Sequence, residues 1–222
     1  MKAQANTLPG EPSPCEEIWL RMIPEELRKS FADYCSWADD QRWELIDGQP
    51  YAMSSPSSLH QMVSMNLSAR LFPLFQGSPC RLFAAPMDVK LSDYDVVQPD
   101  LMVVCEPGQI RSAHIEGAPR LVVEISSPTT QRHDRVRKLE LYGKFGVMEY
   151  WLVTPHPFMV EVLRNAGGLY VTEKVYTEQH VLRSPAFPEL RLDLSEVFAD
   201  LPPQPEIDEV REGTPPYVVS GN

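Results

Sequence analysis

Two carboxylates within apolar strands are the residues of this sequence whose type and spacing could do chemistry. Asp100 precedes the run LMVVC, and Glu124 lies inside the run RLVVEIS. Burial of an ionised carboxylate costs far more than one hydrogen bond returns, so each acid needs a partner. Acids on neighbouring strands can share a divalent cation, and magnesium held in this way supports phosphodiester cleavage. The alternative is that each acid ends its strand or pairs with an arginine.

The segment after the second acid predicts a helix that adds cations. Ser127-Pro128-Thr129-Thr130 has the residue types of a helix start, and Gly146 suits a helix end. Asp134, Lys138 and Tyr142 recur every four residues and therefore share one helix face. A lysine there can orient an attacking water or stabilise charge that develops on a phosphate. The alternative is a solvated basic face, formed by Arg132, Arg135, Arg137, Lys138 and Lys144.

The composition indicates a globular chain that is unusually acidic for a DNA-binding protein. With 222 residues, 43% of them hydrophobic, it is long enough to bury a core. Its net charge is −11, whereas DNA affinity comes largely from Lys and Arg on phosphates. We therefore expect weak, salt-dependent DNA binding unless a homodimer or another partner adds positive charge. No apolar run approaches the ~20 residues of a membrane span, and no secretory signal is recognisable, so we expect a cytoplasmic protein.

The four cysteines bear on the same expectation. Cys15, Cys35, Cys80 and Cys105 are widely separated, and none belongs to a CxxC pair. This spacing favours reduced thiols over disulfides or a zinc site. Two disulfides remain the alternative.

Proline and charge patterns predict a lead-in over residues 1–17, one domain over 18–200 and a Pro-rich acidic tail over 201–222. Within the domain we predict helices over Pro24–Trp37 and Ser57–Phe75, with a hairpin around Asp47-Gly48. His60 lies in the first turn of the second helix, where a surface or capping role is the alternative to a functional one. Strands are predicted over Arg81–Ala85, Val89–Leu91, Val97–Cys105, Leu121–Ser126, Val147–Thr154, Phe158–Arg164 and Leu169–Tyr176, with a last strand and helix turn between Pro185 and Phe198. Glu149, at the start of a strand, is expected to be structurally paired.

Five segments occur here in an order that resembles a known family. They are RWELIDGQPYAMS, SSLHQ, VVQPDLMVV, GAPRLVVEISSPTT and DRVRKLELYGKFGVMEYWLV. Over roughly Trp43 to Leu163 the chain is similar to the Uma-type putative restriction endonuclease family, a branch of the PD-(D/E)XK nuclease superfamily. The resemblance implies an α/β, restriction-endonuclease-like fold, in which helices flank a mixed central β-sheet. It also implies a site for Mg²⁺, or Mn²⁺ in its place, and DNA as the substrate.

The resemblance assigns roles residue by residue. Asp100 matches the acid of the PD element and Glu124 the acid of (D/E)XK. The lysine position of that motif is Ser126 here, and in the Uma-type branch the matching lysine is Lys138 on the following helix. Lys90 is the rival lysine. Glu44 and His60 match two further positions near the family's site, whereas Gln49 replaces a usual acid.

These observations predict a magnesium-dependent DNA endonuclease. Asp100 and Glu124 would bind metal and Lys138 would act on the water or the phosphate. Glu44 would complete a second metal's ligands. His60, Asp134 and Tyr142 would support the site or contact phosphate. The alternatives are a catalytically inactive nuclease-fold module that binds nucleic acid or protein, favoured by Ser126, Gln49 and the acidity, and a hydrolase of small phosphoesters.

Overall fold

The computed structural model describes residues 24–38, 41–126 and 133–202 of the chain. Their contacts divide the chain into two compact units. The smaller unit comprises the residues up to Met53 together with Lys90–Val97. The larger comprises Ser54–Val89 together with the residues from Gln98 onward. The secondary structure is mixed α/β, as the sequence predicts.

The smaller unit contains a hairpin and two short helices. Strands β1 (Trp43–Ile46) and β2 (Gln49–Ala52) pair antiparallel. Asp47 and Gly48 between them have φ values of 52° and 76°. Positive φ at both central residues defines the two-residue turn that Asp-Gly favours, so the predicted hairpin is confirmed. Strand β5 (Asp95–Val97) pairs with the other side of β1.

The predicted helix over Pro24–Trp37 is wrong in its middle. The structure has a 3-10 turn, η1 (Glu25–Leu27), and a separate helix α2 (Phe31–Ser36). Ser30 caps α2, because its hydroxyl accepts from the Asp33 amide while the Asp33 carboxylate accepts from the Ser30 amide. This reciprocal capping box starts a new helix at Phe31.

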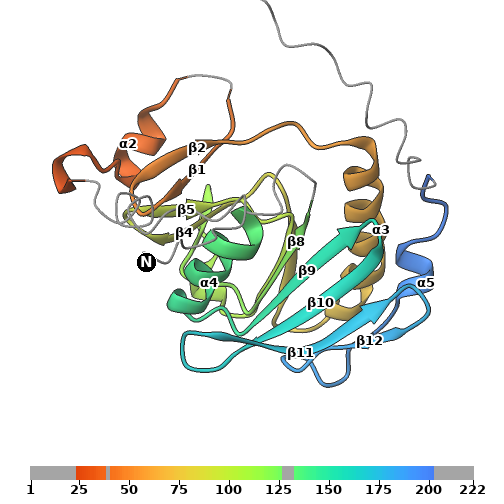
Figure 1. Ribbon diagram of the computed structural model, residues 1–222. Coiled ribbons are helices and arrows are strands. Elements are labelled where there is room, and N and C mark those ends of the chain that lie inside the picture. The colour runs from red at the N-terminus through yellow and green to blue at the C-terminus, as the bar shows by residue number, and fades with distance from the viewer. Residues whose placement is uncertain (1–23, 39–40, 127–132, 203–222) are drawn as a thin grey trace, which may run out of the picture. The chain divides into compact units, whose positions relative to one another are not determined.

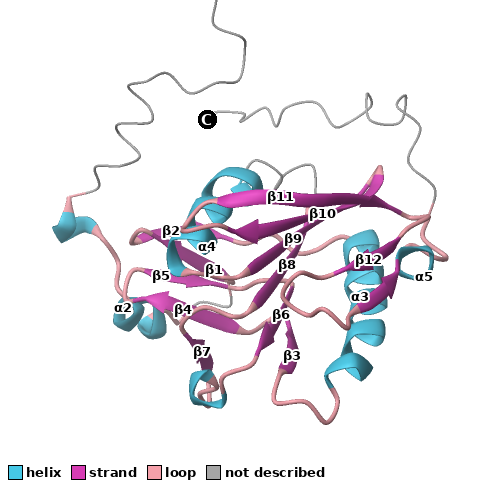
Figure 2. Cartoon of the chain, turned by 90° about the horizontal axis from the view of Figure 1, so that it is seen from below, coloured by secondary structure: helices cyan, strands magenta, loops and turns pink. Residues whose placement is uncertain are grey.

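The larger unit is built on a six-stranded sheet with the order β11-β10-β9-β8-β6-β3 (Figure 2). Strands β8 and β9 are parallel and the other pairs are antiparallel, so the sheet is mixed. Its strands are β3 (Arg81–Ala84), β6 (Leu101–Val104), β8 (Leu121–Ile125), β9 (Glu149–Pro155), β10 (Phe158–Asn165) and β11 (Tyr170–Thr177).

Two helical segments lie on opposite sides of β8 and β9 (Figure 1). Helix α3 (Ser58–Phe75) packs Val63, Leu67, Leu71 and Phe75 against the sheet, and this 18-residue helix is confirmed. On the other side the chain forms a π-helix, η3 (His133–Lys138), followed by α4 (Leu139–Phe145). The remaining elements are β4 (Asp88–Ser92), η2 (Pro107–Gln109), β7 (His114–Glu116), β12 (Val181–Arg183), β13 (Arg191–Asp193) and α5 (Leu194–Val197).

The predicted strand over Val97–Cys105 is interrupted at the point that matters for the site. β5 ends at Val97 and β6 begins at Leu101. Pro99 lies between them, and proline has no N–H to donate to a sheet ladder. Asp100 therefore stands directly before a strand rather than within one. Strands β7 and β12, of three residues each, escaped prediction because they are too short to show a period.

The expectation that all cysteines are reduced thiols is wrong for one pair. Cys80 and Cys105 form a disulfide, and Cys35 is free and exposed. Arg81 lies opposite Val104 in the β3–β6 ladder, so the two cysteines occupy the next opposed positions. Strand pairing brings them together across 25 residues of sequence, which spacing alone does not reveal. In the described part of the chain, no helix is both long enough and apolar enough to cross a membrane.

Candidate active site

Asp100 is held by the main chain of the neighbouring strand. Its Oδ2 accepts a 2.7 Å hydrogen bond from the Ile125 amide and lies 3.1 Å from His60 Nε2. The described residues contribute no hydrogen bond to its other oxygen, Oδ1. Because Leu101 lies opposite Val123, Asp100 and Glu124 are the next residues along the two strands. The two sequence-predicted acids are therefore neighbours.

Glu124 is held by two side chains from the following helix. Its Oε1 accepts from Lys138 Nζ at 3.0 Å and from Tyr142 Oη at 2.7 Å. The side chains of Lys138 and Glu124 are only 4% and 5% exposed, and Tyr142 is fully buried. A buried carboxylate that receives an ammonium and a phenol in this way is fixed in position and compensated in charge. Lys138 therefore lies beside Glu124, and its part in catalysis stays a prediction.

The helix positions these two groups through its register. Lys138 is the last residue of η3, and Tyr142 follows four residues later in α4, so both point to the same side. The helix ends as predicted, because Gly146 adopts φ 83° and its amide bonds back to Gly143 and Tyr142. The predicted helix start at Ser127-Pro128-Thr129-Thr130 lies outside the described residues, and the π-helical form of His133–Lys138 was not predicted. The side chain of Asp134, predicted on the same face, lies outside the described residues.

His60 comes from the start of α3. Ser57 caps this helix and accepts from the His60 amide at 3.2 Å, which fixes the first turn. The ring reaches Asp100 through Nε2, while Nδ1 is buried and meets no hydrogen-bond partner in the described part of the chain. His60 is thus brought to the acid pair, as the resemblance implied, by contacting a carboxylate.

Lys90 and Glu44 belong to the smaller unit. Lys90 pairs with Asp93 at 3.0 Å, and its ammonium lies 5.1 Å from the centroid of the Phe31 ring. Glu44 lies on β1 opposite Tyr51 and is 3% exposed. Lys90 therefore has a role within its own unit. The part of Glu44 in a metal site stays a prediction.

Ser126, at the lysine position of the superfamily motif, ties β8 to β9. It is buried, and its hydroxyl donates to the Val153 carbonyl at 3.2 Å and contacts Thr154 Oγ1 at 3.3 Å. A hydroxyl carries no charge, and the cation beside Glu124 is Lys138 from the following helix.

Glu149 has the structural pairing that the sequence suggested. It is fully buried and accepts from Trp151 Nε1, from Ser184 Oγ at 2.7 Å and from the Ala186 amide at 2.7 Å. Burial raises the pKa of the Glu149 carboxyl above its ordinary value of 4.5, and these hydrogen bonds oppose the rise. Its place is in the core.

The metal-binding capacity of the site rests on two carboxylates. Among the described residues, no three His, Cys, Asp or Glu side chains are grouped closely enough to hold an ion. Magnesium commonly takes one or two carboxylates and keeps several waters, so Asp100 and Glu124 match its usual protein ligands. Sequence reasoning missed the Ile125 amide that fixes Asp100, because a main-chain donor leaves no signal in the residue types.

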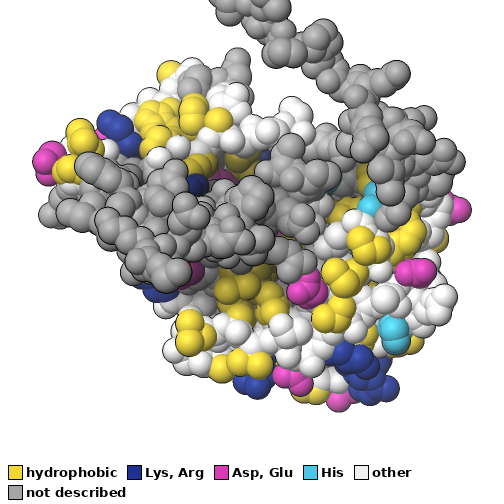
Figure 3. Space-filling view, in the orientation of Figure 1, with side chains coloured by type: hydrophobic (Ala, Val, Ile, Leu, Met, Phe, Trp, Pro, Cys, Tyr) yellow, Lys and Arg dark blue, Asp and Glu magenta, His cyan; other side chains and the backbone are white. Residues whose placement is uncertain are grey.

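The surface charge of the larger unit can be followed at the lower right of Figure 3, over β11 and β12. There a small group of Lys and Arg side chains has hydrophobic and acidic side chains beside it. The weak, salt-dependent DNA binding expected from the net charge stays a prediction.

The comparisons with known proteins give the family and the fold of this chain. The Uma2 family, described as "Putative restriction endonuclease", matches residues 31–195. The chain belongs to this family.

Two relatives give the extent of the similarity. The uncharacterized protein slr1290 of Synechocystis sp. is 30% identical over 136 residues, which is 60% of this chain and 68% of that protein. The crystal structure of a putative nuclease of the DUF820 group from Anabaena variabilis superposes with a TM-score of 0.64 at 18% identity. It covers 76% of this chain and 97% of its own, and at this identity it establishes the fold alone.

Proposed function

We propose that this protein is a magnesium-dependent endonuclease that hydrolyses DNA phosphodiester bonds on a restriction-endonuclease-like fold. The observation that carries the proposal is the buried contact of Lys138 and Tyr142 with Glu124, one strand away from Asp100. Burying such a cluster costs desolvation free energy that an apolar core would avoid. An active site that needs charges in fixed positions would explain why this protein has the buried cluster in spite of that cost.

Asp100 and Glu124 are the residues that would hold the metal. The described residues leave Asp100 Oδ1 without a hydrogen bond while Oδ2 is fixed by the Ile125 amide, so one oxygen is oriented and the other is available. The Ile125 carbonyl is a further candidate ligand. Bound magnesium would lower the pKa of a coordinated water and neutralise charge on the scissile phosphate.

Lys138 and Tyr142 have separable tasks. Tyr142 donates to Glu124 from a fully buried position and its ring packs edge-on against Tyr150, with centroids 5.4 Å apart, so it orients the carboxylate. Lys138 donates from the same side and carries the charge. It orients the attacking water or stabilises the phosphorane-like transition state. His60 supports Asp100 through Nε2.

Two predicted residues complete the proposal without direct support from contacts. Glu44 would contribute to a second metal, and Asp134 would support Lys138.

A second function, a catalytically inactive module that binds nucleic acid or protein, is favoured by one observation. Lys138 is 4% exposed and is engaged by Glu124, so substrate reaches it only if this pair opens.

Metal binding tests the proposal directly. Calorimetric titration of the full chain with Mg²⁺, and with Mn²⁺ in parallel, should show binding that Asp100→Asn and Glu124→Gln each weaken by at least about tenfold, since each removes one anionic ligand. The same proteins should be assayed for cleavage of supercoiled and linear DNA at each metal concentration.

Glu173→Gln is the matched control, because this carboxylate is 45% exposed and pairs only with Arg164 among the contacts described. It should bind metal and cleave DNA as the wild type does. Wild-type metal binding without cleavage of any DNA form would favour the inactive module. Equal metal binding by the wild type and both site variants would eliminate the site.

A further inference from the structure

The solvent face of helix α3 lacks the charges that such a face normally carries. Met62, Met65 and Phe72 are 37%, 68% and 56% exposed, and Ala69 between them is exposed too. The opposite face of α3 is already buried in the core, and polar residues such as Asn66, Ser68 and Arg70 lie between the two apolar faces. An exposed apolar stripe on a helix whose other apolar face is already covered marks a candidate interaction surface.

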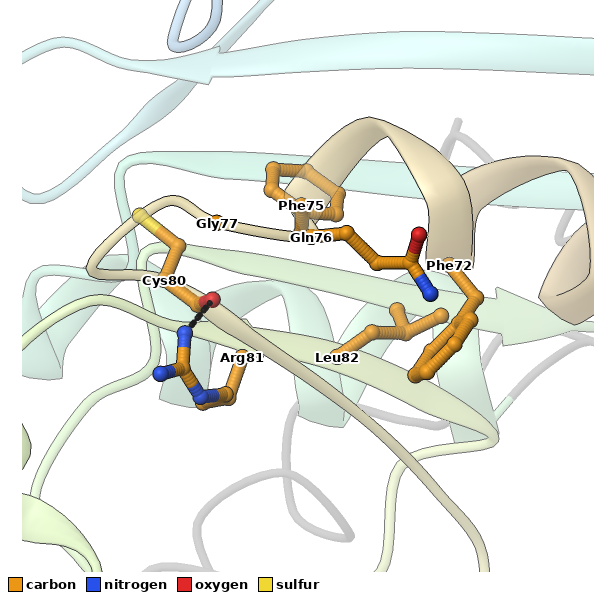
Figure 4. A pocket seen from close by; sticks show the side chains of 7 residues that line it. All are labelled: Phe72, Phe75, Gln76, Gly77, Cys80, Arg81 and Leu82. Atoms are coloured by element: carbon orange, nitrogen blue, oxygen red, sulfur yellow. Dashed lines mark hydrogen bonds between the residues drawn. The ribbon is translucent and has the colours of Figure 1, made fainter.

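A shallow groove runs beside this face. Its walls are α3 and β3, the outermost strand of the six-stranded sheet. One part has a volume of about 350 Å³, and Leu82 and Phe72 continue it into a second part (Figure 4). In Figure 4 the Phe72 ring and Leu82 lie side by side, whereas Phe75 points away from them. Among the described residues that line the groove, Arg81 is the only charged one. A single cation is too little for binding a polyanion, so DNA is an unsuitable occupant.

The spacing of the exposed residues indicates a helix as the occupant. Met62, Met65, Ala69 and Phe72 follow one another at steps of three, four and three, which is the spacing of a seam between two packed helices. Such a seam inserts each side chain between residues of the facing helix, and a small residue beside large ones lets the two backbones approach.

The same seam is complementary to itself. Consider a second α3 that packs antiparallel on the exposed face, with the twofold axis at the level of Leu67 along the helix. Met62 then faces Phe72 of the other copy, and Met65 faces Ala69. Large residues then meet small ones, and methionine sulfur meets an aromatic ring, a favourable contact. A twofold axis also brings like charges together, so an uncharged seam suits self-association of a chain with net charge −11.

We propose that this protein forms a homodimer through an antiparallel pairing of its α3 helices along Met62, Met65, Ala69 and Phe72. The seam is limited in area, because an 18-residue helix is about 27 Å long and its exposed face about 10 Å wide. Two such seams cover only about 540 Å² in all, below the ~1,200 Å² at which specific interfaces usually begin, so the walls of the groove have to contribute as well. The dimer is therefore reversible and depends on protein concentration.

Sedimentation of the full chain over a concentration series tests the proposal. The wild type should shift from monomer to dimer as its concentration rises. Ala69→Glu and Met65→Glu should each weaken self-association by more than about tenfold, because each places a carboxylate in an apolar interface. Both positions are exposed, so the variants should keep the circular dichroism of the wild type. Val175→Glu, at an exposed apolar position on β11, should leave the dimer unchanged.

Mixing two variants tests the antiparallel register. Met65→Glu and Ala69→Lys should each fail to self-associate but should form a mixed dimer, since the new carboxylate of one copy then faces the new ammonium of the other. A wild-type monomer at every attainable concentration would overturn the proposal. A dimer that survives Ala69→Glu and Met65→Glu, or a mixture that does not pair, would overturn the assignment to this face. DNA cleavage enters none of these measurements, so they stand apart from the nuclease proposal.

Discussion

At the scale of single residues, Lys138 has two roles that can be separated. It compensates the buried charge of Glu124, and it is the cation assigned to the chemistry. Removing one partner of a buried ion pair typically costs about 3–5 kcal/mol, because the other charge is left uncompensated. A lysine variant therefore has to be examined for stability as well as for rate.

Lys138→Met removes the charge and keeps most of the apolar stem. If Lys138 acts in the transition state, turnover should fall by roughly 10²-fold or more, as for the loss of one preorganised electrostatic group. DNA affinity should change little, because one phosphate contact alters the salt slope by only about one unit. Single-turnover cleavage and DNA binding at several salt concentrations measure the two effects.

Lys90→Met is the matched control, since Lys90 pairs with Asp93 in the smaller unit. Its turnover should equal that of the wild type. Circular dichroism should show that both variants are folded, and added Mg²⁺ should stabilise Lys138→Met by compensating Glu124. Full cleavage by Lys138→Met together with lost cleavage by Lys90→Met would reverse the assignment of the lysine.

At the scale of elements, the position of α4 depends on a close contact between two glycines. A Cβ atom built on Gly143 would lie 2.5 Å from the Gly168 carbonyl oxygen, in the turn between β10 and β11. Asn165 joins the same two segments, because its side chain donates to the Gly143 carbonyl at 2.9 Å and accepts from the Gly168 amide at 2.8 Å. The residue next to Gly143 is Tyr142, which donates to Glu124, so a shift at this contact would also move Tyr142.

Gly143→Ala should displace α4 and with it Tyr142 and Lys138. We expect a loss of about 1–3 kcal/mol in the free energy of unfolding, as for other overpacked sites, together with weaker metal binding. Denaturant titration and calorimetry measure the two quantities. Gly108→Ala, where a Cβ meets no atom within 4 Å, is the control and should change neither. Unchanged stability in Gly143→Ala would show that the turn yields to the methyl group.

Elements with a strong local signal could be predicted from the sequence, and contacts that depend on strand pairing could not. A few adjacent residues are enough to predict the period of α3, the Asp47-Gly48 turn and the end of α4 at Gly146. The disulfide between Cys80 and Cys105 and the commitment of Ser126 to β9 depend on which strands are neighbours. Lys138 was found from its helical spacing and the family resemblance, and the structure adds its burial.

At the scale of the whole molecule, Glu149 links the sheet to the C-terminal part of the fold and should make stability depend on pH. Burial raises the pKa of its carboxyl, so the folded state keeps this proton to higher pH than the unfolded chain does. The stability that Glu149 contributes is complete below its ordinary pKa of 4.5 and is lost as the pH rises through the raised value.

Glu149→Gln removes this titration at nearly constant size. The free energy of unfolding of the wild type, relative to the variant, should therefore fall as the pH rises from about 4 to about 8. Denaturant unfolding at a series of pH values measures the difference, and titrations shared by both proteins cancel. Glu189→Gln, at an exposed carboxylate, should give a nearly flat profile. A pH-independent difference for Glu149→Gln would contradict the expected direction.

The hydrogen bond from the Ile125 amide to Asp100 has a consequence for how this family can vary. Its donor belongs to the main chain, so exchanging the side chain at position 125 leaves it intact. The side chain itself is 2% exposed and packs in the core, which restricts it to apolar types. Proline is apolar but has no N–H, and it alone would release the carboxylate. Across family members we expect valine, isoleucine or leucine at position 125 and never proline. We expect the aspartate that its amide holds, Asp100 here, to be invariant.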